Sequence, residues 1–239
     1  MLLRLLATDW LKIRRTAIRL LIVLGPLGVV ALQGVNYALR YDYLMDATKE
    51  DPWGYFLRNV AGLALPTLFV GLALVASMVA GLEHRTFTWK QMLALPVRRG
   101  HVFLSKFLLV ALLLLFSCTL LLAGAIGLAA AIGLDFGTLP FGMLLELMYY
   151  PYLAAMPFVA LQLWLSVGMA NQAVPLTVGI VGMVVAMFGG SRFGDWFPYR
   201  WPSLANEAGE PFVSALYGVA LGAVLLAAGA VHFTRKDVR

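Results

Sequence analysis

The sequence predicts an all-α integral membrane protein with six transmembrane helices. Hydrophobic residues make up 62% of the 239 residues and charged residues only 13%, so the chain has too little polar surface to cover a water-soluble globule. Long uncharged runs alternate with short charged segments, and most basic residues stand at the ends of those runs. We therefore attribute the formal charge of +6 to segments beside the membrane and expect no nucleic-acid partner.

The first 19 residues predict an amphipathic interfacial helix on the inner leaflet. One stripe at helical spacing is apolar: Leu3, Leu6, Trp10, Ile13 and Ala17. The opposite stripe is polar: Arg4, Thr8, Lys12, Arg15 and Arg19. A cleaved signal peptide is the alternative, because a basic region precedes an apolar one and small residues follow near Ala31 and Ala38. The long amphipathic segment and the five further spans favour the interfacial helix.

Residues 20–239 predict a single transmembrane domain. A helix needs about 20 mostly apolar residues to cross a bilayer. Four runs without Asp, Glu, Lys or Arg each give one span: 20–39, 60–82, 107–134 and 211–233. The uncharged run 147–191 is too long for one crossing, and near its middle it holds the polar turn 171–175, which ends in the helix-breaking Pro175. It therefore predicts two spans, which makes six.

The distribution of charge predicts the orientation. Six spans leave both termini on one side, and the basic residues divide 13 to 5 in favour of the N-terminal segment, the segment 83–106 and the tail. By the positive-inside rule both termini are expected to be cytoplasmic. The other side holds nine of the 12 acids and a cluster of Tyr and Trp residues, as in an outer interfacial belt.

Motifs for chemistry are missing from the sequence. It has no Gly-x-x-x-x-Gly-Lys-Ser/Thr phosphate loop, no Gly-x-Ser-x-Gly elbow and no His spacing suited to a metal. The single cysteine, Cys118, excludes an intrachain disulfide, and the serines within the spans are expected to hydrogen-bond inside their own helices. We expect no enzymatic activity and no cofactor in this chain. Asp135 and Glu146, between spans three and four, are candidates for contact with a cationic substrate, although exposed loop acids need no such role.

The segment 83–106 is a charged island between two apolar runs, with Glu83 at its entrance and basic residues throughout. This layout suggests a cytoplasmic surface that meets another protein. With six spans, the amphipathic N-terminal helix and no ATP site, the chain resembles a type-2 ATP-binding cassette (ABC) transporter permease over essentially its whole length. The residues that match the family pattern are Glu83, Thr86, Leu93, Pro96, Val97, Arg99 and Lys106. Arg85 stands where the family usually has a glycine.

The resemblance implies a cytoplasmic coupling helix over 85–95, between spans two and three, that rests in a groove of a separate ATPase subunit. Its apolar side chains would insert into the groove: Phe87, Trp89, Met92 and Leu93. Basic side chains of the helix and of the residues that follow it would meet acidic edges: Arg85, Lys90 and Arg98. Glu83 and the segment up to Arg99 would transmit the motion, and ATP and Mg would bind only in the partner. The alternative is that Phe87 and Trp89 anchor the loop in the inner interface.

Within this family the chain is most similar to lantibiotic-immunity and bacitracin-resistance permeases, through the run 161–166, Asn171, Gly179 and the segment 196–202. That similarity implies a re-entrant outer segment over 191–210. The candidate outer substrate or gate region consists of Trp196, Tyr199 and Trp201, with Asp135 and Glu146.

The resemblance implies a dimeric permease of the bacterial cytoplasmic (inner) membrane. A second permease chain, two ATPase subunits and membrane lipid would be its partners, and it would export an amphipathic peptide, antibiotic or lipid-like compound. The alternative function is a membrane scaffold or sensor that recruits a cytoplasmic partner without transport.

Overall fold

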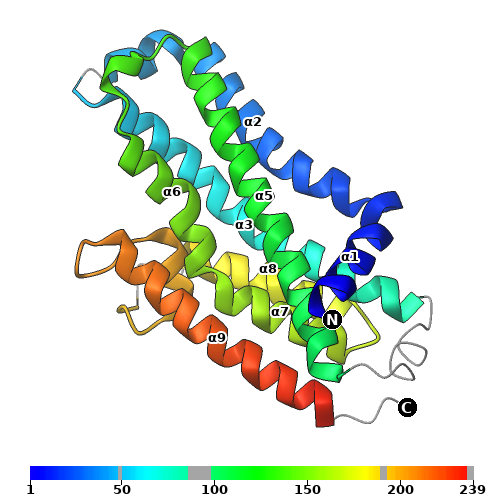
Figure 1. Cartoon of the computed structure of the whole chain (residues 1–239). Helices are drawn as coiled ribbons and strands as arrows, with labels where there is room; N and C mark the ends of the chain where they lie inside the picture. The colour runs from blue at the N-terminus through cyan, green and yellow to red at the C-terminus, as the bar shows by residue number, and fades with distance from the viewer. Residues whose placement is uncertain (48–49, 86–97, 189–192, 236–239) are drawn as a thin grey trace.

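The computed structural model describes residues 1–47, 50–85, 98–188 and 193–235, which form a bundle of helices (Figure 1). The described residues contain no strand, so the predicted all-α class is confirmed for them. The elements are α1 Leu2–Lys12, η1 Ile13–Arg15, α2 Ile18–Ala47, α3 Pro52–Arg85, α5 Arg99–Ala131, η2 Phe136–Thr138, α6 Phe141–Ala154, α7 Met156–Gly168, α8 Ala173–Phe188, η4 Pro198–Ser203 and α9 Pro211–Arg235.

Five helical stretches among the described residues are long and apolar enough to cross a membrane: Ile18–Met45, Pro52–His84, Arg99–Ala131, Phe141–Gly168 and Pro211–Arg235. The sixth apolar helix, α8, has 16 residues and is shorter than a typical span. The structure therefore supports a multi-pass membrane protein, while the count of six spans stays a prediction.

The uncharged run 147–191 divides at the polar turn, as predicted. α7 ends at Gly168 and α8 begins at Ala173, where the Asn171 side chain accepts a hydrogen bond from the Ala173 amide at 3.0 Å. Pro175 lies in the first turn of α8 and does not break a helix, because the first turn needs no N–H from that position. The preceding helical stretch begins at Phe141 and not at residue 147, because Glu146 lies within the helix and does not mark its start.

The N-terminal segment differs in detail from the prediction. α1 ends at Lys12, Thr16 has an extended backbone with φ −114° and ψ 160°, and α2 starts at Ile18. The predicted apolar stripe splits in two: Leu6 and Ile13 pack on the bundle, whereas Leu3 and Trp10 are exposed. The span predicted over 20–39 continues to Ala47, with a non-helical residue at Arg40.

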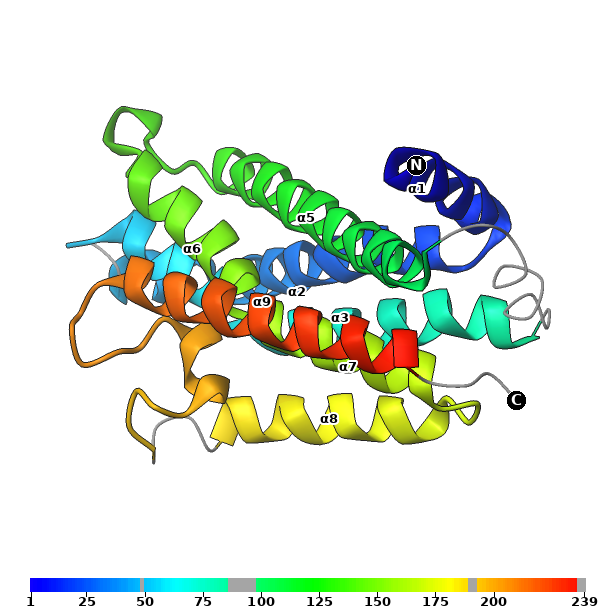
Figure 2. The same ribbon diagram turned by 60° about the horizontal axis from the view of Figure 1, so that its bottom comes forward.

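The helix ends gather at two ends of the bundle. α1, the C-terminal end of α3, the start of α5 and the end of α9 lie at one end, which we call the terminal end (Figures 1 and 2). Phe103 of α5 and Phe233 of α9 are in contact there, with ring centroids 5.9 Å apart. The end of α2, the start of α3, η2 and the start of α9 lie at the other end, which we call the distal end (Figure 1). Both described ends of the chain thus lie on one side, as six crossings would require.

Candidate functional site

Most of the predicted coupling residues lie outside the described residues: Thr86, Phe87, Trp89, Lys90, Met92, Leu93, Pro96 and Val97. The structure instead describes the two helix ends that flank this segment. α3 ends at Arg85, and Arg98 is the N-cap residue of α5, with Arg99 as its first helical residue. Of the charged residues predicted here, Glu83 is buried in the last turn of α3, while the Arg98 side chain is exposed.

Glu83 belongs to a charge cluster at the terminal end, formed by the buried residues Asp9, Glu83, Ser105 and Lys106 and by Lys12, whose side chain is 34% exposed. The Lys106 side chain is only 1% exposed, and its Nζ lies 2.9 Å from Glu83 Oε1 and 3.4 Å from Asp9 Oδ1. Lys12 Nζ donates to the same Glu83 oxygen at 2.8 Å. Ser105 Oγ donates to Asp9 Oδ2 at 2.8 Å.

Three helices far apart in the sequence supply this cluster. α1 contributes Asp9 and Lys12, which lie one turn apart, α3 contributes Glu83, and the second turn of α5 contributes Ser105 and Lys106. Among these described contacts, two carboxylates face two ammonium groups, so their formal charges cancel. Removing charges from water is costly, and mutual pairing at hydrogen-bond distance offsets that cost. The cluster therefore holds α1 against the two helix ends that flank residues 86–97.

The sequence revealed this cluster only in part. Glu83 was predicted to transmit motion, and Lys106 matched the family pattern without a role of its own. Lys12 was assigned to the polar stripe of the interfacial helix, and Asp9 was missed. The available signal was that Asp9 is the one acid among the first 41 residues, in an otherwise basic segment. A buried ion pair between distant segments has no spacing rule by which it could be found.

A second set of polar contacts joins α3, α7 and the start of α8 near the terminal end. The Ser77 and Ser166 hydroxyls lie 3.2 Å apart, between α3 and α7. The Ser166 carbonyl accepts a hydrogen bond from Gln172 Nε2 at 2.9 Å and lies 3.2 Å from His84 Nε2. The expectation that these serines bond within their own helices is wrong for this pair, because close packing of α3 on α7 brings the two hydroxyls together.

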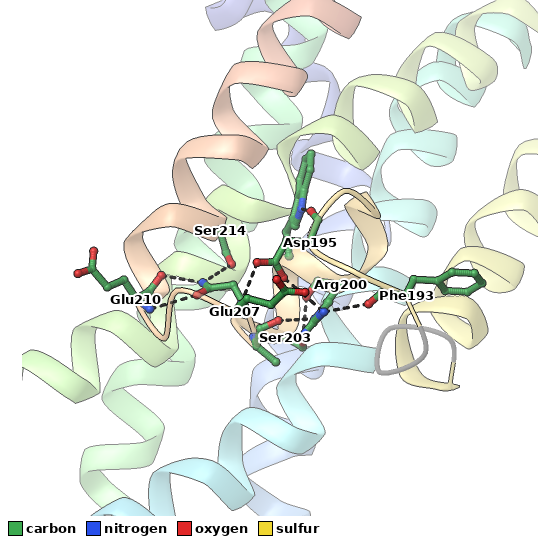
Figure 3. Close-up of polar contacts among 10 residues, drawn as sticks. Phe193, Asp195, Arg200, Ser203, Glu207, Glu210 and Ser214 are labelled. Carbon is green, nitrogen blue, oxygen red and sulfur yellow. Dashed lines mark hydrogen bonds and ion pairs between the residues drawn. The ribbon is translucent and has the colours of Figure 1, made fainter.

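At the distal end, residues 193–210 fold into a compact loop around η4 (Figure 3). Arg200 joins the two halves of the loop, because its Nε donates to the Ala205 carbonyl at 2.6 Å and its Nη1 to the Phe193 carbonyl at 2.9 Å. Asp195 Oδ1 lies 3.4 Å from Arg200 Nη1, and Asp195 Oδ2 accepts from the Glu207 amide at 2.8 Å. These contacts give the loop a defined shape. Whether it re-enters the membrane stays a prediction.

The aromatic residues of the predicted gate region have different surroundings. Trp196 is 72% exposed, whereas Trp201 is buried and donates from Nε1 to the Asp195 carbonyl at 2.6 Å. Tyr199 packs on Phe158 of α7, with ring centroids 4.3 Å apart. Burial raises the pKa of the Tyr199 phenol, because the ionised form would lose its hydration.

The two acids of the predicted gate region lie elsewhere. Asp135 is at the corner between α5 and α6, where its Oδ1 accepts from the Gly137 amide at 2.9 Å and its carbonyl from Trp53 Nε1 at 2.8 Å. This corner and the η4 loop occupy separate places in both views (Figures 1 and 2). Glu146 was expected in a loop, but it lies half-buried within α6, because that helix begins five residues earlier. A role of these acids in substrate contact stays a prediction.

The described residues contain no group of three or more His, Cys, Asp or Glu side chains placed to hold a metal ion.

Comparison with known proteins gives one finding. Residues 5–186 match the model of a family described as ABC-2 family transporter proteins. No curated protein and no solved structure matches. The matched range includes α3, α5 and all of α1 except its first three residues, and thus every residue of the charge cluster. With about three quarters of its length matched, the chain belongs to the ABC-2 family of transporter proteins.

Proposed function

We propose that this chain is the permease subunit of an ATP-driven exporter, with ATP and Mg bound and hydrolysed in a separate ATPase subunit. Membership of the ABC-2 family supports a permease, and it implies an ATPase partner in general terms. The observation that carries the coupling role is the charge cluster, which joins α1 to the helix ends on both sides of residues 86–97.

The cluster gives the coupling proposal a physical basis. A segment that is pushed by an ATPase must transfer the displacement to helices and not simply deform. Glu83 and Lys106 lie 2.9 Å apart at the two anchor points of residues 86–97, so a displacement of one helix end acts on the other. Packed elements with few alternative arrangements transmit motion in this way. In this proposal, Phe87, Trp89, Met92 and Leu93 contact the ATPase, while Glu83 and Lys106 connect them to α3 and α5.

The cargo in this proposal is an amphipathic peptide, an antibiotic or a lipid-like compound, moved outward or out of the membrane. The apolar character of the helices supports this class, because apolar walls select by size and hydrophobicity more than by polar groups. The working unit would be a homo- or heterodimer in the bacterial cytoplasmic membrane, with cytoplasmic termini. The similarity to bacitracin-resistance permeases makes antibiotic resistance the phenotype to test.

Replacing Phe87 and Trp89 together with alanine is expected to release the ATPase from the membrane. Buried aromatic residues dominate helix-in-groove interfaces, and the loss of two such anchors costs about 2 kcal/mol each. The measurement is co-purification of the ATPase with the tagged permease in mild detergent. The matched control is Phe188→Ala with Trp196→Ala, which removes two exposed aromatic residues from the distal end. If the variant without Phe87 and Trp89 retained as much co-purified ATPase as the unaltered protein, the docking proposal would be wrong.

Replacing Glu83 with alanine is expected to uncouple the assembled complex without releasing the ATPase. The substitution removes the carboxylate shared by Lys12 and Lys106 and leaves the sequence of residues 86–97 intact. Because the loss of this buried partner also lowers stability, the comparison uses equal amounts of folded, assembled complex. The measurement is cargo-stimulated ATP hydrolysis in the purified complex, which should fall toward the unstimulated rate. Full stimulation in this variant would contradict the coupling role.

A scaffold or sensor that recruits a cytoplasmic partner without transport is the alternative. Transport assays with the purified complex in vesicles separate the two, because a scaffold would bind its partner and move no cargo.

A further inference from the structure

The bundle contains a cavity of about 500 Å³ between α2, α3, α5 and α6, next to residues 202–204 of the η4 loop. Volumes of this order suit a small-molecule ligand. Along α2 the cavity extends from Leu21 to Val29, and along α3 from Arg58 to Val75. It lies within a single chain and includes no residue of the charge cluster.

The cavity wall consists mostly of apolar residues, and at least two of its polar groups are already hydrogen-bonded within the protein. Leu, Val, Ala and Gly residues form most of its wall. Two of its polar groups already have partners within the protein: the Thr67 hydroxyl donates to the Leu63 carbonyl at 2.8 Å, and the Tyr152 hydroxyl donates to the Ala111 carbonyl at 3.0 Å. A ligand in this space would therefore gain mainly from the burial of hydrocarbon, about 0.8 kcal/mol for each CH₂ group.

The cavity wall also includes exposed residues. Leu24, Arg58 and Gly62 line the cavity and are exposed at the surface, so an apolar chain can enter from the surrounding membrane. Arg58 lies in the second turn of α3, toward the distal end, and brings a cation to the wall.

The ion pair of Arg58 with Asp51 does not prevent Arg58 from binding an anionic head group. Arg58 Nη2 lies 3.1 Å from Asp51 Oδ2, and both side chains are 58% exposed. Ion pairs this exposed contribute about 1 kcal/mol or less, so an anionic head group can replace or share the Asp51 contact at little cost. An apolar cavity with a cation in its exposed wall is complementary to an anionic amphiphile, which combines a hydrocarbon chain with a negative head group.

We propose that this cavity binds one hydrocarbon chain of an anionic amphiphile from the membrane, with the head group beside Arg58. The proposal goes beyond the permease function, because it requires neither an ATPase nor transport. The amphiphile is either a resident lipid or the exported compound. These two sources share one chemistry and differ in their response to ATP.

The test is photolabelling of the purified full chain in phosphatidylcholine nanodiscs. The probe is a lysophosphatidylglycerol with a diazirine in the middle of its chain, and the labelled peptides are identified by mass spectrometry. Labelling is expected within 21–29, 61–75 and 114–121, and an excess of unlabelled lysophosphatidylglycerol should suppress it in the unaltered protein. Labelling spread over all lipid-facing helices, or unaffected by the competitor, would overturn the proposal.

A substitution that fills part of the cavity tests the same site, and a similar substitution outside the cavity serves as its control. A Cβ at Gly62 would meet no atom within 4 Å, so Gly62→Phe adds a ring at the cavity wall without an initial clash. Gly28→Phe is the control, because a Cβ there also meets open space and Gly28 does not line the cavity. If the new ring excludes two CH₂ groups of the bound chain, the affinity for the probe falls roughly tenfold, and labelling of Gly62→Phe should fall by the same factor. Equal labelling of the two variants would count against the site.

The head group is tested separately with Arg58→Gln. This change should weaken labelling by the anionic probe and leave labelling by a matched lysophosphatidylcholine probe unchanged; an equal response of both probes would remove Arg58 from the site. In the complex with its ATPase, loss of labelling on addition of MgATP identifies the amphiphile as cargo. Persistent labelling identifies a resident lipid. Binding can thus be established even if the permease proposal fails, and the reverse also holds.

Discussion

Replacement of Lys106 by methionine is expected to destabilise the protein by about 3–5 kcal/mol. The substitution keeps an unbranched apolar side chain of nearly the same length but removes the ammonium group that lies between Glu83 and Asp9. Glu83 keeps Lys12, whereas Asp9 keeps the Ser105 hydroxyl and a Lys12 ammonium at 4.0 Å. One buried carboxylate charge is left without full compensation. The measurement is the thermal unfolding midpoint in detergent, together with the yield of monodisperse protein.

The controls separate the lost pair from a general loss of positive charge. Arg14→Met removes an exposed cation from η1 and should leave the midpoint almost unchanged. Adding Asp9→Asn to Lys106→Met restores charge balance, so the double variant should recover part of the stability. A double variant less stable than Lys106→Met alone, or a harmless Lys106→Met, would show that the charges are not coupled.

The second large effect is expected at Gly218, where α9 crosses the junction of α6 and α7. A Cβ at this position would overlap the backbone of Ala154, with its carbonyl oxygen at 2.6 Å. Backbone atoms cannot rotate away as a side chain can, so Gly218→Ala must displace α9 and is expected to cost about 3 kcal/mol.

Gly127→Ala is the matched control, because a Cβ there meets no atom within 4 Å and the helix gains about 1 kcal/mol of propensity. Thermal unfolding of both variants in the same detergent is the measurement. If Gly218→Ala unfolds at the same temperature as the unaltered chain, the close contact of α9 with Ala154 is not required.

The helices could be predicted from the sequence because the length of a run without charged residues is a local property of the chain. The limits of the runs were set by charged residues, which is why several boundaries were misplaced. The helical segment of α2 resumes after a kink at Arg40 and reaches Ala47, and α6 begins at Phe141 ahead of Glu146, because a charged residue near a helix end does not by itself set the helix boundary. The polar turn at Asn171 was located correctly, since its side chain caps the helix that follows.

The candidate site was predictable only at its entrance. Glu83 attracted attention as an acid at the start of a basic segment, but its partners come from α1 and α5. The same holds for Ser77 and Ser166, whose contact depends on how α3 packs against α7. The cavity could not be predicted either, because it depends on how completely side chains from four helices fill the space between them.

The sequence by itself determined that the chain is a helical membrane protein, where most of its helices lie and that it resembles a permease, since composition, run length and motif are all local. Only the tertiary structure decided that Asp9 and Lys12 meet Glu83 and Lys106, and that Gly62 and Arg58 line an apolar cavity. The physical reason is that a membrane-spanning helix is specified by its own residues, whereas the pairing of buried charges and the gaps between helices depend on how those helices pack together.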